Sequence, residues 1–154
     1  MKKYIKFQSD LMNLYDKNKL TRMKWGYLDD DFNSLLFTID GKSAVIIPTS
    51  KFYLTDAILD ERKQWMQFNT VFKIDNDYVP ASISGIEYEK QDTFCKLCSE
   101  NGVEVWFNKR RLKYFDDKTL QFKIKSPVSP VMVYENNELV GLIMPVRRGG
   151  NNAI

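Results

Sequence analysis

The chain has 154 residues, 44% of them hydrophobic and 14% aromatic, which fits one folded domain and excludes a wholly disordered chain. Its 23 Lys and Arg residues nearly balance 20 Asp and Glu residues, so the formal net charge is only +3. That value excludes a histone-like protein but allows a local basic patch. Histidine is absent from the sequence, which excludes Ser-His-Asp and Cys-His catalysis, histidine-ligated metals and histidine pH switches.

The N-terminal residues show two short apolar patterns. Residues 3–7 alternate polar and apolar side chains, which predicts a strand. Leu11, Leu14 and Tyr15 then follow at helical spacing, which predicts an amphipathic helix over 10–17.

A hairpin is the clearest local signal in the first third of the chain. Residues 20–28 alternate imperfectly and predict a strand. The apolar runs 34–39 and 43–47 flank an Asp-Gly pair at 40–41. Such a pair between apolar runs predicts a hairpin, because both central residues of the favoured turn take a positive φ.

The remaining elements follow from the same spacing rules. For residues 49–102 we expect a helix over 50–63, a strand over 65–74, a strand containing Ile83, Ile86 and Tyr88, and a helix over 90–100 that ends at Asn101-Gly102. After these we expect a strand over 103–107 and then a helix that Asn108 caps and that has Leu112 and Phe115 on one face. Next we expect a strand over 120–124 and a hairpin of 131–134 and 139–144. The chain should end in a flexible tail at 149–154.

The two ends of the chain have similar patterns. A shift of one hundred residues pairs Ile5 with Val105 and Phe7 with Phe107, and the hairpins match after a small further shift. Residues 3–48 and 103–147 therefore predict a duplicated βαβββ unit, with 49–102 as an enlarged connection or insertion. The alternative is a chance similarity between two amphipathic segments.

The segment 103–147 resembles the C-terminal half-domain of the bacterial DNA polymerase III β subunit, the sliding clamp. The shared features are a strand ending in Phe107-Asn108, a helix and the run Leu-Gln-Phe-Lys-Ile at 120–124. The most specific are Ser-Pro-Val-Ser-Pro-Val at 126–131 and Leu-Ile-Met-Pro-Val-Arg at 142–147. Clamp domains consist of two βαβββ halves. The resemblance therefore implies an α+β fold, with residues 1–148 forming a single clamp-like domain.

The resemblance also implies a function. A clamp ring contains six such domains, so one domain per chain would need a hexamer to encircle DNA. We therefore expect a non-enzymatic, cytoplasmic binding module in a DNA-replication, phage or mobile-element setting. Its expected partners are double-stranded DNA, clamp-binding peptides or clamp subunits, with self-association also open and no membrane contact. The alternatives are a small carboxylate- or Cys-dependent enzyme and a DNA-binding regulatory protein unrelated to clamps.

A basic cluster is the first candidate site. In clamps the corresponding helix faces the DNA channel, where Lys and Arg side chains contact phosphates without reading the bases. The alternative is a solvated helix face. The predicted DNA-binding residues are Lys109, Arg110, Arg111 and Lys113, extended by Lys123 and Lys125.

The C-terminal apolar motif is the second candidate site. It resembles the clamp segment that helps to line a pocket for partner peptides, and a flexible Met suits such a groove. The alternative is an ordinary buried last strand. The predicted partner-binding residues are Leu142, Met144, Pro145, Val146 and Arg147.

Two further motifs predict no chemistry. Cys95 and Cys98 form a lone CxxC without the second pair or the histidines that zinc would need, so we expect buried, reduced thiols. The run Asp29-Asp30-Asp31 suits a magnesium ion in a nuclease, but contiguous acids in a loop are usually solvated. We therefore expect no catalytic residues, metal or cofactor.

Overall fold

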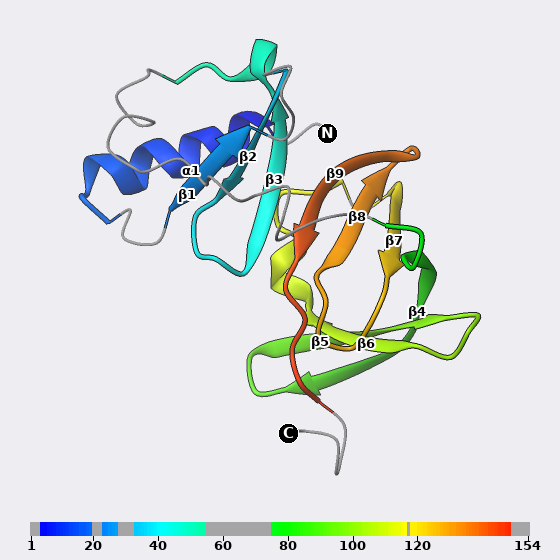
Figure 1. The fold of residues 1–154 in the computed structure, drawn as a ribbon. Coiled ribbons are helices and arrows are strands. Elements are labelled where there is room, and N and C mark those ends of the chain that lie inside the picture. Colours follow the sequence, from blue (N-terminus) through cyan, green and yellow to red (C-terminus); the bar gives the residue numbers. More distant parts are fainter. Residues whose placement is uncertain (1–3, 20–22, 28–32, 55–74, 117, 149–154) are drawn as a thin grey trace.

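The computed structural model describes residues 4–19, 23–27, 33–54, 75–116 and 118–148. Within these residues it contains one α-helix and a nine-stranded antiparallel sheet, so the α+β class is confirmed (Figure 1). The elements are α1 (Tyr4–Asp16), β1 (Lys24–Tyr27), β2 (Ser34–Thr38), β3 (Ser43–Pro48), η1 (Thr49–Lys51), β4 (Val79–Glu89), β5 (Asp92–Ser99), β6 (Glu104–Asn108), η2 (Lys109–Leu112), β7 (Leu120–Ile124), β8 (Val131–Glu135) and β9 (Glu138–Ile143). The strand order is β1-β2-β3-β9-β8-β7-β4-β5-β6.

The helix α1 begins earlier than predicted. Residues 4–7, predicted as strand, form its first turn, while the predicted helix 10–17 forms the rest. Phe7 and Leu11 are buried and lie one turn apart, so the helical spacing extends back to the start of α1. A five-residue alternation was too short to distinguish a strand from one turn of helix.

The predicted hairpin is confirmed as β2 and β3. Gly41 takes a positive φ of 77°, and the Asp40 carboxylate accepts hydrogen bonds from the backbone N–H groups of Lys42 and Ser43 at 2.8 and 3.3 Å. Asp40 itself is not among the described residues with positive φ, so it stabilises the turn through its side chain.

The helix predicted over 90–100 is wrong. The segment 90–100 forms β5 instead, because Cys95 and Leu97 alternate into the core and β5 is paired on both sides, by β4 and β6. The helix over 50–63 is reduced to the 3-10 turn η1 among its described residues, and its remainder, like the predicted strand 65–74, lies outside the described residues. The strand predicted around Ile83 is confirmed as part of β4.

The C-terminal strands were predicted correctly, but their helix was not. Strands β6 to β9 occupy the predicted positions. Asn108 caps the following turn as expected, since its side-chain oxygen accepts a hydrogen bond from the Arg110 N–H at 3.1 Å. The helix is only the 3-10 turn η2, and the chain reaches Phe115 without a further helix.

The two meanders β1–β2–β3 and β7–β8–β9 meet through their last strands, with Ala44 of β3 opposite Leu142 of β9. Of the predicted repeat, the sheet contains these two joined three-stranded meanders. The two halves begin differently, because the first starts with α1 and the second with β6 and a 3-10 turn. Matching βαβββ halves are therefore not found among the described residues.

The C-terminal part of the sheet closes on itself. After β9, the Met144 N–H donates to the Lys42 carbonyl and the Val146 N–H donates to the Trp106 carbonyl, each at 2.8 Å. The chain after β9 thus runs first along β3 and then along β6. Strands β4 to β9 therefore curve into a barrel-like sheet, which we call the closed sheet although a single bridge between Trp106 of β6 and Val146 is what joins its two ends. The first meander continues from β9 through β3, and α1 lies beside it (Figure 1).

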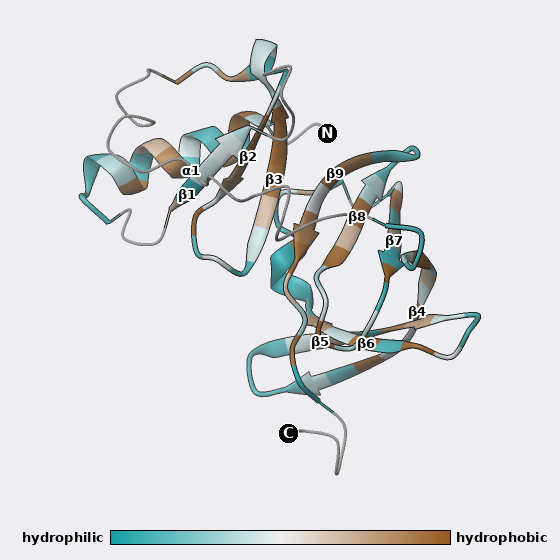
Figure 2. Ribbon diagram, viewed as in Figure 1, coloured by the Kyte–Doolittle hydropathy of each residue, from teal (hydrophilic) through white to brown (hydrophobic). Residues whose placement is uncertain are grey.

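The main core lies between α1, the first meander and the inner face of the closed sheet. Figure 2 shows apolar residues concentrated along the central strands. Gly141 marks the tightest point, because a β-carbon there would lie 2.3 Å from the Ala44 carbonyl oxygen and 2.6 Å from the Phe115 ring. A second buried cluster on the opposite face consists of Leu36, Ala44, Ile46, Met132 and Leu142.

Candidate functional site

The predicted basic cluster lies on η2, which two apolar anchors hold against the core. Leu112 is 8% exposed and Phe115 is fully buried. Because these residues face inward, Lys109 and Arg110 lie on the solvent side. The Asn108 cap fixes the start of η2, so the cluster is presented on an ordered turn.

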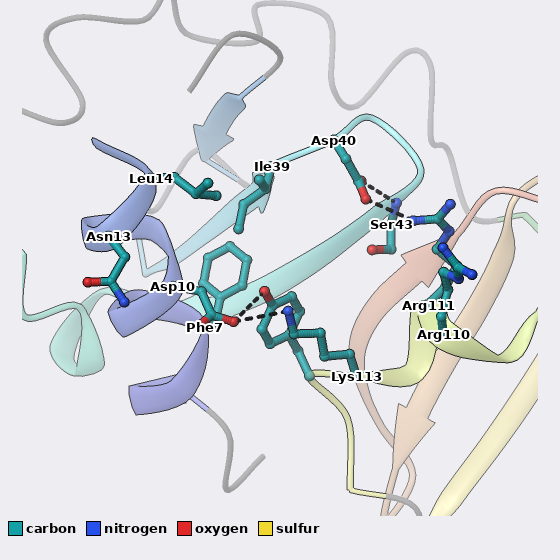
Figure 3. A pocket seen from close by; sticks show the side chains of 11 residues that line it. Phe7, Asp10, Asn13, Leu14, Ile39, Asp40, Ser43, Arg110, Arg111 and Lys113 are labelled. Carbon is teal, nitrogen blue, oxygen red and sulfur yellow. Dashed lines mark hydrogen bonds and ion pairs between the residues drawn. The ribbon is translucent and has the colours of Figure 1, made fainter. Parts of the chain in front are cut away.

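A pocket of about 450 Å³ lies beside this cluster, between α1, the β2–β3 turn and η2. Figure 3 shows Asp10 pointing toward Lys113, and Asp40 toward Arg111. The pocket therefore contains groups of both signs. It lies where the N-terminal helix and meander meet the closed sheet.

Three of the four clustered cations are paired with acidic side chains of other elements. Arg110 contacts Asp92 at the start of β5. Arg111 contacts Asp40 at 3.0 Å, and Lys113 contacts Asp10 at 3.2 Å. Exposed pairs contribute only about 0–1 kcal/mol each, so an incoming anion can replace the carboxylates that face Arg110 and Lys113. Arg111 is less accessible, because its side chain is only 19% exposed.

Asp10 and Tyr114 form a polar link in the same pocket. The Tyr114 hydroxyl donates to the Asp10 carboxylate at 2.8 Å. Burial acts to raise the pKa of Asp10, but the hydrogen bonds from Tyr114 and Lys113 outweigh it and hold this pKa below its usual value. Burial, together with the hydrogen bond to Asp10, raises the pKa of Tyr114 far above its usual value.

Lys123 and Lys125 do not share these contacts. Both lie on β7 or just after it, where Lys123 lies 5.0 Å from the centre of the Tyr134 ring and Lys125 contacts Asp75 at 2.5 Å. The hydrogen bond to Asp75 raises the pKa of Lys125. The six predicted DNA-binding residues therefore divide into one group at η2 and another at β7, and their neighbours differ.

The predicted partner-binding segment divides in a similar way. Leu142 is 5% exposed and belongs to the second buried cluster, as expected for an ordinary core strand. Met144 and Pro145 are half-buried, whereas Arg147 is exposed. Val146 and Arg147 line a groove of about 400 Å³, which also contains Trp106 and Val128.

The contacts of Arg148 were not predicted from the sequence. Its guanidinium lies 4.1 Å from the centre of the Phe94 ring and pairs with Glu87 at 2.6 Å and Glu89 at 2.5 Å. The spacing of the two glutamates, two residues apart on a strand, predicts that they share a face. Nothing local in the sequence indicates that the C-terminal chain crosses that face.

The two cysteines lie on β5 rather than on a helix. Cys95 is buried, and burial raises the pKa of its thiol, so the unreactive protonated form is favoured. Cys98 is half-buried, and its Sγ lies 2.9 Å from the Ser84 Oγ. Among the described residues no group of three or more potential metal ligands occurs, and the run Asp29-Asp30-Asp31 lies outside them.

No family model, curated protein or solved structure was found to match the chain. The described helix is too short and too polar to cross a bilayer. The fold thus defines an α+β protein with one antiparallel sheet, and the likeness to sliding clamps remains a prediction from the sequence.

Proposed function

We propose that this protein is a non-enzymatic binding module that contacts the sugar-phosphate backbone of double-stranded DNA through Lys109, Arg110, Arg111 and Lys113. The resemblance of residues 103–147 to a sliding-clamp half-domain gives the setting, which is DNA replication in a phage or another mobile element. The clamp-like two-half architecture belongs to this proposal, and its support is the joining of two three-stranded meanders through β3 and β9.

The observation that carries the proposal is the presentation of four cations within five residues beside an open pocket. The side chains of Arg110 and Lys113 are 55% and 52% exposed. Cations arranged in this way bind phosphates through charge and counterion release, with no base-specific contact. The nearby carboxylates of Asp10, Asp40 and Asp92 reduce the local net charge, so we expect weak binding that disappears at moderate salt.

Fluorescence anisotropy with labelled duplexes of unrelated sequence tests the proposal. Arg110→Gln combined with Lys109→Gln should weaken binding to every duplex equally and lower the slope of log affinity against log salt by roughly 0.9 for each phosphate that is no longer neutralised. Lys118→Gln is the matched control, because Lys118 is exposed but lies outside the cluster. Absence of binding at low salt, or an equal weakening in the control, would contradict the proposal.

A second candidate function is supported by the groove beside the C-terminal segment. Two predicted partner-binding residues, Val146 and Arg147, line it together with Val128, which is 64% exposed. The groove also contains Glu104 and Arg148, and Arg148 is already paired with Glu87 and Glu89. Its apolar wall and the exposed Arg147 suit an extended peptide with apolar side chains and a carboxylate, as in the clamp-type peptides that the resemblance implies.

Isothermal titration with a synthetic clamp-binding peptide tests this second function. Val128→Asp should abolish the measured heat, because it places a carboxylate in the apolar wall, while the unfolding transition should be unchanged. Tyr53→Asp is the control, since Tyr53 is 63% exposed and does not line this groove. If the Val128 variant binds the peptide as the wild type does, the groove is not the binding site.

A further inference from the structure

Strand β4 has one edge that is paired over only part of its length. It pairs with β5 from Ala81 to Glu89 but with β7 only over Val79–Ala81. Within the described residues, the edge from Ser82 to Glu89 has no strand beside it, and every residue there except the half-buried Gly85 is exposed. Figure 1 shows β4 and β5 along the lower side of the molecule, below β7, β8 and β9.

Three apolar side chains line up on one face of this open edge. Ser84 is a bulge, because Ile83 lies opposite Leu97 while Gly85 lies opposite Lys96. The bulge shifts the alternation, so that Ile83, Ile86 and Tyr88 all share a face with the buried residues of β5. These side chains are 46%, 49% and 80% exposed. These three side chains continue the apolar face of β5 onto β4, where no described strand covers them.

The usual protection of an open edge is weak here. Proline and lysine are absent between Ser82 and Glu89, and the protective features of the segment are the bulge at Ser84 and the carboxylates of Glu87 and Glu89. Glu87 and Glu89 lie on the opposite face, where the single Arg148 guanidinium pairs with both and offsets one of their two charges. An approaching strand would therefore meet hydrogen-bonding groups and apolar side chains, with little net charge.

We infer that β4 pairs with β4 of a second copy of this chain, in antiparallel orientation about a two-fold axis at Ile86. Counting past the bulge, this register places Ile86 opposite its own copy and Ile83 opposite Tyr88 on the apolar face. On the other face it places Glu87 opposite Gly85 and Glu89 opposite Ser82. No two carboxylates are directly opposed, and every apolar side chain meets another.

Self-complementarity of this kind is what an isologous dimer requires, and it favours a second copy over an unrelated strand. A single strand edge buries less surface than a standard interface, so the dimer should be in equilibrium with the monomer. The inference does not depend on DNA binding. It also differs from a six-membered ring, because a two-fold contact through β4 uses up that edge and closes at two copies.

Sedimentation velocity of the full chain between about 1 µM and about 1 mM tests the inference. The wild type should shift from monomer to dimer across this range. Ile86→Lys should weaken the dimer by at least about tenfold, because it places two cations opposite each other. Ile5→Lys is the matched control, since Ile5 is 63% exposed on α1 and should leave the dimer unchanged. Circular dichroism of both variants confirms that the fold is retained.

A mixing experiment tests the axis itself. Ile86→Lys and Ile86→Glu should each dimerise at least about tenfold more weakly than the wild type, while an equimolar mixture should regain dimer, because opposite charges then face each other across the axis. A wild type that stays monomeric at the highest concentration would overturn the inference. So would an assembly of any size that Ile86→Lys leaves intact, or a mixture that remains monomeric.

Discussion

The meanders β1–β2–β3 and β7–β8–β9 have the same antiparallel order but are enclosed differently. The first is covered by α1, whose Phe7 ring lies 6.0 Å from Phe37 of β2. The second is part of the closed sheet, where β7 continues into β4 and the chain after β9 reaches β6. Similar strand patterns therefore led to different surroundings, and the difference comes from residues outside the meanders.

The contacts between the two regions are of two kinds. The apolar contact is dense, because β3 and β9 are hydrogen-bonded and Phe7 packs edge-on against Tyr114, with ring centres 5.0 Å apart. The polar contacts, from Asp10 to Tyr114 and from Asp40 to Arg111, surround the open pocket. We therefore expect the apolar contacts to contribute most of the free energy of unfolding at this junction. The polar contacts should contribute a smaller part.

The largest effect should come from Gly141→Ala at the junction of β3 and β9. The new methyl group would overlap the Ala44 carbonyl oxygen and the Phe115 ring, and neither can move without separating the two meanders. We expect a loss of about 3 kcal/mol in the free energy of unfolding, measured by urea denaturation.

Gly85→Ala is the matched control for this substitution. A β-carbon at Gly85 would lie 3.6 Å from the flexible Lys96 side chain, which is an ordinary contact. If the two variants are equally destabilised, the close approach of β3 to β9 is not the cause.

A smaller effect should follow from Gln8→Ala, which separates α1 from the segment after β3. The buried Gln8 side chain donates to the Lys51 carbonyl at 2.9 Å and accepts from the Tyr53 N–H at 2.7 Å. Removing it leaves both backbone groups without this partner, so we expect a loss of about 2 kcal/mol in thermal or urea unfolding.

The control for Gln8 is Gln121→Ala. Gln121 is exposed, and its side chain accepts a hydrogen bond from the Asn137 N–H at 3.0 Å. The change there should cost less than about 0.5 kcal/mol. Similar losses in the two variants would mean that Gln8 does not hold α1 against the segment after β3.

The elements that depend on near neighbours could be predicted from the sequence. The β2–β3 hairpin, strands β6 to β9 and the Asn108 cap follow from short patterns, and all are present. Residues 90–100 misled because Phe94, Leu97 and Cys98 fit a helical face, whereas the strand that forms directs Cys95 and Leu97 into the core. Pairing with β4 and β6, which lie on the far sides of two turns, decided the outcome.

In the candidate site, too, the features set by sequence neighbours could be predicted and those set by distant elements could not. The positions of Lys109, Arg110, Arg111 and Lys113 could be predicted to lie together, because they are sequence neighbours. Their acidic partners could not, since Asp10, Asp40 and Asp92 come from three other parts of the fold. Only the folded chain shows that three of the four cations are paired with carboxylates, and for this reason we expect weak DNA binding.

The smallest effect should come from Tyr114→Phe, which removes the hydrogen bond to Asp10 and leaves the apolar contact with Phe7 intact. At neutral pH we expect a loss of about 1.5 kcal/mol in the free energy of unfolding, because the acceptor is charged. Tyr88→Phe is the matched control, since Tyr88 is 80% exposed and should show almost no change.

The pH dependence of this loss distinguishes the hydrogen bond from a packing defect. The pKa of Tyr114 is raised in the folded state, so its contribution is complete below the unfolded value of 10.0 and falls as the pH rises above it toward the folded pKa. The pKa of Asp10 is lowered, so its contribution is complete above the unfolded value of 3.8 and falls as the pH drops toward the folded pKa. The difference between wild type and Tyr114→Phe should thus be largest between about pH 5 and 9 and shrink on both sides. If the difference in free energy of unfolding stays constant from acid to alkaline pH, the loss is due to packing. The hydrogen bond between Tyr114 and Asp10 then does not stabilise the junction.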